Sequence, residues 1–185
     1  MTKVIIGFAG KKGSGKSTAA VHLKNDLNFE AHSFAFPMRD MLYKFLGNMG
    51  VSLDDALHYL LFDKETVIPQ VGKSARVLLQ TLGTEWGRLS VDCDIWVKAS
   101  EVMLLNSQSQ RIVFDDVRFE NEAAMIRGLG GLIIHVDRLD SLPDTHCSEQ
   151  GIMLAEQDVW LPNDRSVSGF LHNVESMVQR VFELV

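Results

Sequence analysis

Apolar runs and amphipathic segments alternate along most of the chain. The runs KVIIGFAG (residues 3–10), RIVFDD (111–116) and GLIIHV (131–136) are short and rich in aliphatic side chains, and polar or glycine residues follow them. Such runs predict buried β-strands. FEAHSFAF (29–36) and DVWL (158–161) show the same character more weakly, and we expect two further strands there.

Helical segments lie between and after these runs. KSTAAVHLKNDL (16–27) places Ala20, Leu23 and Leu27 on one face, as an amphipathic helix does. Proline, serine or glycine marks the ends of the other periodic segments, and we expect helices at 37–46, 74–89, 94–105, 120–130 and 166–184. This alternation predicts an α/β fold with a mainly parallel sheet, in which ligands bind beyond the carboxyl ends of the strands.

Two stretches lack a regular pattern. Residues 47–73 mix a short helical piece with loop, and we interpret them as an insertion beside a ligand. Residues 138–157 are polar and irregular, which makes them a candidate lid. Because the chain shows no internal repeat and no low-complexity tract, a single domain over 1–185 is expected.

The turn after the first predicted strand carries the most specific motif. GKKGSGKS fits G-x-x-x-x-G-K-[ST] through Gly10, Gly15, Lys16 and Ser17, between a predicted strand and a predicted helix. Glycines let backbone N–H groups wrap around a phosphate, and the helix N-terminus adds partial positive charge. The alternatives are a chance glycine-rich turn or the dinucleotide pattern G-x-G-x-x-G, which fails because Thr18 occupies its third glycine position. The turn therefore predicts a nucleoside triphosphate, ATP, with Mg²⁺ held by the serine hydroxyl.

Composition narrows the ligand class. The 185 residues are 46% hydrophobic and carry a net charge of −6, which argues against a protein that holds nucleic acid by its backbone. No segment approaches the ~18 apolar residues of a membrane span, and a cytoplasmic location is expected. Neither the two cysteines nor the histidines have metal-ligand spacing; we interpret His135 as a core or supporting residue and His146 as a candidate lid residue.

FDDVRFENE is the second informative stretch. Asp115 and Asp116 end a predicted strand, where a P-loop protein places a carboxylate near Mg²⁺. Arg118 follows at the same edge, and its planar guanidinium suits phosphate. Glu122 comes four residues later, so a local salt bridge with Arg118 is the alternative, but the position of the pair at the carboxyl end of the strand favours a functional role.

A third group of polar residues suits the molecule that would accept a phosphoryl group. Arg76, Gln80 and Gly83 are spaced to share one helix face. The cation suits a phosphate, the amide suits a base edge, and the glycine lets a ligand approach the helix closely. An exposed polar face is the alternative. Trp96 either fills the core or forms a platform for a ring. Arg88 lies in the same predicted helix as Arg76. Further cations and polar groups near the predicted strand ends are Arg39, Arg127, Arg138, Asn163, Asp164 and Ser166.

With its motifs taken in their order along the sequence, the chain resembles the bacteriophage deoxynucleoside monophosphate kinases, a branch of the P-loop nucleoside monophosphate (NMP) kinase superfamily. The resemblance covers nearly the whole chain, through GKKGSGKST, FAFPMRDML, RVLLQTLGTEWGR, DIWV, FDDVRFENEA, IIHVDR, DTHCSE and LPNDRS. GKST alone is shared by very many proteins, whereas the order of the other motifs is much more specific.

The resemblance implies a three-layer P-loop fold with a five-stranded parallel sheet, an NMP-binding insertion near 47–73 and a lid near 138–157. It implies the reaction ATP + dNMP → ADP + dNDP, in the cytoplasm of a host cell. The residues then expected at ATP are Lys12, Gly13, Ser14, Gly15, Lys16, Ser17, Thr18, Asn163 and Ser166. Those expected at the acceptor are Arg39, Arg76, Gln80, Gly83, Arg88, Trp96, Asp116, Arg118 and Glu122.

Within this reaction, Lys16 and Arg118 are the expected charge-neutralising groups. Asp116 is expected to hold the water shell of Mg²⁺ or to orient Arg118. Many family members have aspartate after the P-loop lysine, whereas this chain has Ser17, the usual P-loop ligand of Mg²⁺. Dephospho-CoA kinase, a phosphomevalonate kinase and an ATP-binding switch are the alternatives, and the helix at 94–105 could pair with a second copy of the chain.

Overall fold

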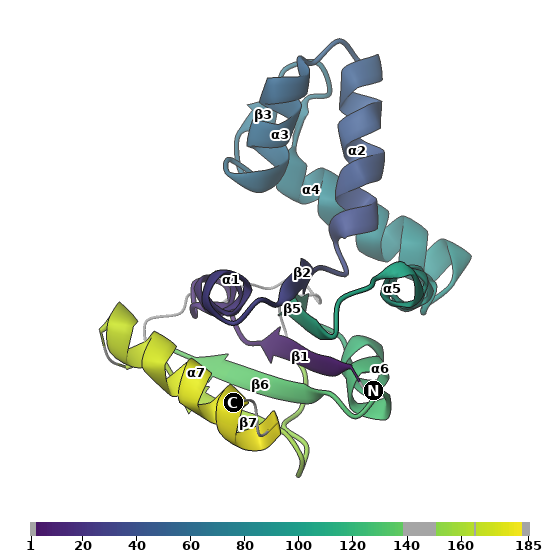
Figure 1. Ribbon diagram of the computed structural model, residues 1–185. Helices are drawn as coiled ribbons and strands as arrows, with labels where there is room; N and C mark the ends of the chain where they lie inside the picture. Colours follow the sequence, from purple (N-terminus) through teal and green to yellow (C-terminus); the bar gives the residue numbers. More distant parts are fainter. Residues whose placement is uncertain (1–2, 139–150, 165, 183–185) are drawn as a thin grey trace. The chain divides into compact units, whose positions relative to one another are not determined.

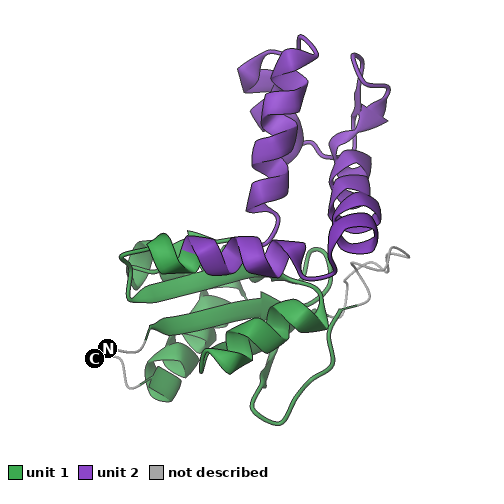
Figure 2. Ribbon diagram, turned by 90° about the vertical axis from the view of Figure 1, so that its right-hand side faces the viewer, with its two compact units in different colours: residues 1–33, 104–185 green, residues 34–103 purple. Residues whose placement is uncertain are grey.

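The computed structural model describes residues 3–138, 151–164 and 166–182. The chain divides into two compact units, each with a core of its own (Figure 2). The first unit comprises residues 1–33 and 104–185, and the second comprises residues 34–103.

The first unit is built on a five-stranded sheet with the order β2-β5-β1-β6-β7 (Figure 1). Every neighbouring pair in this sheet is parallel. Since the strands run in one direction, the turns that follow them share one edge of the sheet, with β1 at the centre. The strands are β1 (Val4–Ala9), β2 (Glu30–His32), β5 (Arg111–Val117), β6 (Leu132–Asp137) and β7 (Val159–Pro162).

Helices cover both faces of this sheet. On one face, α1 (Lys16–Asp26) and α7 (Val167–Phe182) pack their apolar side chains into a core with Phe8 of β1. On the other face, α6 (Glu120–Gly128) approaches β1 closely, because a Cβ added at Gly7 would lie 2.7 Å from Ile126. Successive residues of a strand point to opposite faces, so β1 serves both cores. The three-layer α/β fold predicted from the sequence is confirmed.

The second unit is mainly helical. Its core gathers Leu42, Leu46, Val51, Ala56, Leu60, Ile68 and Ala75. Ser74 caps α4 by accepting a hydrogen bond from the Val77 N–H at 3.4 Å, as predicted. The elements are α2 (Phe36–Asn48), α3 (Leu53–Leu61), the antiparallel hairpin β3 (Val67–Ile68) and β4 (Lys73–Ser74), α4 (Ala75–Gln80), a π-helix (Thr81–Val91) and most of α5 (Ile95–Asn106).

Two element predictions were wrong in detail. The expected strand at 29–36 ends at His32, because Phe36 and Pro37 already form the first turn of α2. The expected α-helix at 74–89 becomes a π-helix from Thr81 onwards, and the Asp92 N–H donates to the Gly87 carbonyl five residues earlier. Because the pitch changes at that point, the one-face argument for the three acceptor residues does not extend to Gly83.

The region boundaries drawn from the sequence remain predictions. Residues 47–73 lie inside the second unit. Residues 139–150 of the expected lid, with His146 and Cys147, lie outside the described residues. None of the helices in the described part of the chain combines the length and apolar character needed to cross a bilayer.

Candidate active site

The turn between β1 and α1 has the backbone of a phosphate-binding loop. Gly10 has φ +139°, and a Cβ there would lie 2.2 Å from the Val136 carbonyl oxygen. Gly15 has φ +110°, and its Cβ would lie 2.6 Å from Nδ2 of Asn163. Only glycine fits these two positions without strain, so the loop shape explains the glycines of the motif. The N-terminus of α1 at Lys16 directly follows.

Charged and polar groups of the loop are poised for an anion. The Lys16 ammonium donates to the carbonyl oxygens of Gly10 and Lys11, both at 2.7 Å, which keeps the charge over the loop. The hydroxyl of Ser14 is fully buried and has no hydrogen-bond partner among the described residues. A buried hydroxyl without a partner is costly, and a bound phosphate oxygen would satisfy it. The loop therefore fits the triphosphate predicted from its sequence.

Asn163 supports the loop from the last strand. Its side-chain N–H donates to the Ser14 carbonyl at 2.8 Å, and its backbone N–H donates to the Asp137 carbonyl at 2.7 Å. Ser166 caps α7, since the Gly169 N–H donates to its hydroxyl at 3.2 Å. Both residues were predicted to bind ATP. The structure gives them supporting contacts, and direct contact with ATP stays a prediction.

The pairing of β1 with β5 contains a bulge at the edge where the loop lies. Gly7 is opposite Phe114 and Ala9 is opposite Val117, so three steps along β5 match two steps along β1. A bulge of this kind re-aims side chains and is common beside active sites. The extra residue falls in the pair of aspartates just before Val117, the last residue of β5.

Each of these aspartates accepts a hydrogen bond from a different serine. The Ser17 hydroxyl donates to Oδ2 of Asp115 at 3.0 Å, and the Ser33 hydroxyl donates to Oδ2 of Asp116 at 2.5 Å. The carboxylate beside the P-loop serine is thus Asp115, which sequence reasoning did not single out for the metal. The two adjacent aspartates were the signal, but the bulge that orients them is invisible in the sequence. A role for Asp116 at the metal stays a prediction.

Glu122 organises the start of α6. Its carboxylate accepts from the backbone N–H groups of Arg118 at 2.7 Å and Phe119 at 3.1 Å, and its side chain is buried. A carboxylate at the third position of a helix commonly satisfies the N-terminal donors in this way. Glu122 therefore fixes the backbone that carries Arg118, and its predicted contact with the acceptor is not required to explain its burial.

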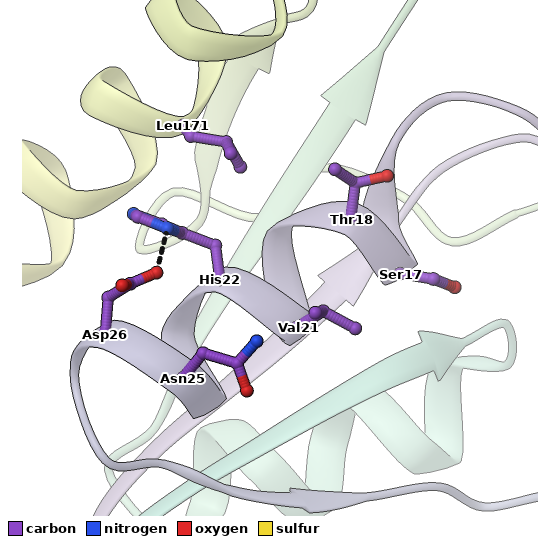
Figure 3. Close-up of a pocket in the computed structure, with 7 residues that line it drawn as sticks. All are labelled: Ser17, Thr18, Val21, His22, Asn25, Asp26 and Leu171. Carbon is purple, nitrogen blue, oxygen red and sulfur yellow. Dashed lines mark ion pairs between the residues drawn. The ribbon is translucent and has the colours of Figure 1, made fainter.

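A pocket of about 480 Å³ opens beside the phosphate-binding loop (Figure 3). His22 lies within it, and its Nδ1 is 2.6 Å from Asp26 one turn along α1. Predicted ATP residues therefore form one end of the pocket, while α1 and α7 form its walls. Its lining residues are Ser17, Thr18, Val21, His22, Asn25, Asp26 and Leu171.

Six of the predicted acceptor residues lie in the second unit. The guanidinium of Arg76 pairs with Glu65 at 2.6 Å, and that of Arg88 donates to the Cys93 carbonyl at 3.0 Å. Arg39 lies on α2, and Gln80 is the last residue of α4. The remaining predicted loop residues, Lys12, Gly13 and Thr18, lie in the first unit with Asp116, Arg118 and Glu122.

Trp96 belongs to the interior of the second unit. It is 3% exposed, and its indole N–H donates to the Gly83 carbonyl at 2.8 Å. A Cβ added at Gly87 would lie 2.6 Å from the indole ring. The ring of Trp86, 6.3 Å away between centroids, lies at its side. The core interpretation of Trp96 is thus supported, and its ring explains the glycine at position 87, whereas a Cβ added at Gly83 would lie 2.7 Å from the sulfur of Met38.

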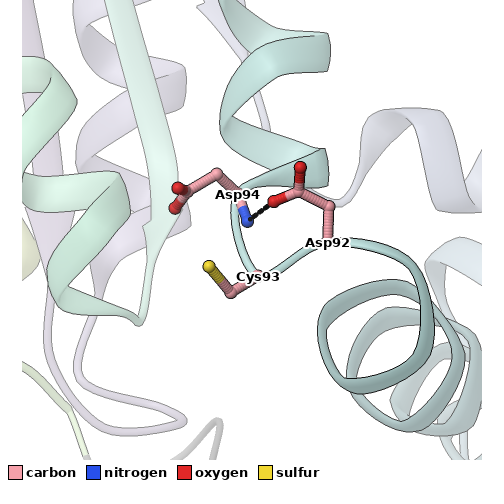
Figure 4. Close-up of side chains that lie close together, drawn as sticks. All are labelled: Asp92, Cys93 and Asp94. Atoms are coloured by element: carbon pink, nitrogen blue, oxygen red, sulfur yellow. Dashed lines mark hydrogen bonds between the residues drawn. The ribbon is translucent and has the colours of Figure 1, made fainter.

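Two other polar clusters have structural partners. Asp92, Cys93 and Asp94 bring possible metal ligands within 4.8 Å of one another (Figure 4). Asp92 accepts from the Asp94 N–H and forms an ion pair with Lys98, which holds the pKa of Asp92 below its usual value. Its charge is therefore already balanced by protein groups.

The second cluster centres on Asp158, whose side chain is fully buried. It pairs with Arg127 at 2.5 Å and with His135 at 2.9 Å. Burial by itself would raise the pKa of Asp158, but hydrogen bonds from Arg127, the Ala155 N–H and His135 outweigh it and keep this pKa below its ordinary value. The supporting role expected for His135 is consistent with these contacts. Arg127, one of the cations near the predicted strand ends, is engaged by Asp158 and Glu120.

The parallel sheet with helices on both faces and the loop between β1 and α1 define the three-layer P-loop fold. Over its whole length the chain resembles the crystal structure of TT1252 from Thermus thermophilus, with a TM-score of 0.50, 16% identity and full coverage of both chains. At that identity the likeness concerns the fold alone.

Sequence comparisons give the family. The sequence model of deoxynucleotide monophosphate kinases matches residues 62–174. A protein of Acanthamoeba polyphaga mimivirus, provisionally named deoxynucleotide monophosphate kinase, is 31% identical over 198 residues, which cover 98% of this chain and 99% of that protein. The deoxynucleotide monophosphate kinase of Enterobacteria phage T4 is 28% identical over 68% of this chain and 55% of its own length. The chain belongs to the deoxynucleotide monophosphate kinase family, and the prediction of a kinase is confirmed.

Proposed function

We propose that the chain transfers the γ-phosphoryl group of ATP to deoxynucleoside 5′-monophosphates and so supplies precursors for DNA synthesis. The observation that carries this proposal is the phosphate-binding loop with the Ser17–Asp115 pair, in a chain of the deoxynucleotide monophosphate kinase family. Both relatives named above carry that enzyme name. The donor, the acceptors and the site residues are the parts that need experiment.

The loop fits Mg²⁺ together with ATP. Mg²⁺ prefers oxygen ligands, and the hydroxyl of Ser17 and the carboxylate of Asp115 lie side by side. Ser17 and Asp115 would hold Mg²⁺, and Asp116 would support the site from the neighbouring position on β5. When bound, Mg²⁺ would neutralise charge on the phosphates. The orphaned hydroxyl of Ser14 gives the phosphates a donor within the loop.

The transfer itself needs positioning and charge. Lys16 is assigned to the outer phosphates, to which it moves from the loop carbonyls that it now contacts. Arg118 is assigned to the transferred phosphoryl group, on a backbone that Glu122 holds in place. Asp116 is assigned to orient the side chain of Arg118.

The second unit is assigned to the acceptor, through Arg39, Arg76, Gln80, Gly83, Arg88 and Trp96. Arg76 would exchange its partner Glu65, which is largely exposed, for the acceptor phosphate. Trp96 would act on the acceptor indirectly, by fixing the π-helix that carries Gly83. The viral and phage relatives fit a host cytoplasm as the place of action, and a homodimer through 94–105 stays a prediction.

The proposal is tested by measuring ADP release from Mg·ATP with one acceptor at a time. The panel comprises dGMP, dTMP, dCMP, dAMP, their ribose counterparts, dephospho-CoA and phosphomevalonate, with GTP replacing ATP in a second series. Turnover that depends on a deoxynucleotide and on ATP is the expected result. Turnover with only a non-nucleotide acceptor, or equal ATP consumption without any acceptor, would overturn the proposal.

A further inference from the structure

Ser33 occupies a special place in the first unit. It directly follows β2 and is the last residue of this unit before the chain enters the second. Its side chain is buried, with 6% exposure for the residue, and its hydroxyl donates to Asp116 at 2.5 Å. A buried serine at a strand end needs a hydrogen-bond partner, and here that partner is a carboxylate assigned to the transfer site.

The sheet brings these two residues together. β2 is the edge strand next to β5, and His32 is opposite Phe114 in their register. After this pair, Ser33 lies just beyond the end of β2, and the two aspartates lie within β5. The bulge in β5 falls at the same level, so the direction of its side chains is not set by regular alternation alone.

A carboxylate in this position needs an additional constraint. The terminal torsion of aspartate is broad and roughly two-fold, so this torsion does not by itself fix the direction of the two oxygens. A hydrogen bond from a buried donor removes that freedom. Phosphoryl transfer depends on alignment, and small misplacements of a supporting group lower the rate.

We propose that Ser33 is a positioning residue for phosphoryl transfer, whose hydroxyl orients the carboxylate of Asp116. This inference rests on the proposed function and deepens it. Ser33 does not touch the phosphates in this role. Its removal should lower kcat and leave the KM for ATP nearly unchanged, because the phosphate-binding loop keeps its own contacts through Lys16 and Asn163.

The test compares four forms of the full-length chain in the acceptor assay with Mg·ATP: the intact chain, Ser33→Ala, Ser33→Thr and Ser107→Ala. Ser107 is a matched control, since its hydroxyl also donates to a carboxylate, that of Glu30 on β2, at 2.7 Å. We expect Ser33→Ala to lower kcat about 10-fold to 100-fold, as loss of a supporting hydrogen bond does. Ser33→Thr should restore most of the rate, and Ser107→Ala should match the intact chain.

A double-mutant cycle separates positioning from damage to the fold. In an Asp116→Asn background, Ser33→Ala should cost less than twofold in kcat, because the carboxylate that it orients is gone. If Ser33→Ala does not fold, Ser33→Cys replaces it, since a thiol is a weak donor of similar size. Losses that multiply in the double mutant, or a Ser33→Thr variant as slow as Ser33→Ala, would overturn the inference.

Turnover by the intact chain tests the proposed function separately from this inference. An intact chain without turnover that depends on a deoxynucleotide would overturn the proposed function and this inference with it. An active intact chain with an equally active Ser33→Ala variant would overturn the inference alone.

Discussion

The Ser17 hydroxyl lies 3.0 Å from Oδ2 of Asp115, and it joins two residues that are 98 positions apart in the sequence. Ser17 is in the first turn of α1, directly after the phosphate-binding loop, and Asp115 is near the end of β5. The contact exists because β5 is the neighbour of β1 in the sheet. It brings a carboxylate beside the serine hydroxyl to which the proposed function assigns Mg²⁺.

Asp115→Asn should weaken the use of Mg²⁺. The amide keeps the shape of the side chain but removes the charge that a divalent cation requires. We expect the Mg²⁺ concentration for half-maximal activity to rise about 10-fold, measured by titrating Mg²⁺ at fixed ATP. Asp116→Asn is the comparison variant, and we expect it to lower kcat with a smaller change in this concentration. The reverse pattern would show that Asp116 is the carboxylate at the metal.

Arg118→Ala should slow the transfer step. Loss of a cation that stabilises developing charge on the phosphoryl group lowers kcat on the order of 10²-fold or more. Steady-state kinetics with saturating ATP and dNMP measure this effect. Arg111→Ala is a control on the same strand. Arg111 is the first residue of β5, and its guanidinium donates to the Leu27 carbonyl. A near-normal kcat for Arg118→Ala would remove Arg118 from the catalytic residues.

Gly87→Ala should destabilise the fold of the second unit. The added Cβ would lie 2.6 Å from the Trp96 ring, which is buried and cannot move aside easily. Overpacking of this kind costs about 1–3 kcal/mol. Gly47→Ala is the matched control in α2, where the nearest atom is 3.5 Å away, and it should stabilise the helix by about 0.5–1 kcal/mol. Urea unfolding of the two variants checks both signs, and equal effects would contradict the packing of Trp96.

Asp158→Ala should destabilise the first unit at neutral pH. Removing one partner of a buried ion pair leaves the other charge uncompensated, which costs about 3 kcal/mol or more. Thermal and urea unfolding at pH 7 measure this loss. Glu101→Gln, at an exposed position on α5, is the control and should change stability by less than about 0.5 kcal/mol.

The same carboxylate makes stability depend on pH. The folded-state pKa of Asp158 lies below its unfolded value of about 3.9, so the folded state holds the ionised form more strongly. Its contribution is fully present above the unfolded pKa and is lost as the pH falls through the folded pKa. The stability difference between the intact chain and Asp158→Asn should therefore be constant above about pH 5 and shrink below about pH 4. A difference that stays constant down to pH 2 would contradict this assignment.

Local patterns were sufficient for most of the elements and for the phosphate-binding loop. β1, β5 and β6 are runs of apolar residues because both faces of a central parallel strand are buried. The loop glycines and Lys16 are adjacent in the chain, so their chemistry can be recognised from spacing alone. Ser74 as a helix cap and Pro37 in the first turn of α2 are local signals of the same kind.

The sequence by itself thus determined the α/β class, the triphosphate loop and, through the order of its motifs, the family. Only the tertiary structure decided that Asp115 contacts Ser17, that Ser33 contacts Asp116, and that the helix after Gln80 is a π-helix packed against Trp96. The physical reason is that strand order, a bulge and the packing of a distant ring arise from contacts between residues far apart in the chain. No periodicity within a short window encodes such contacts.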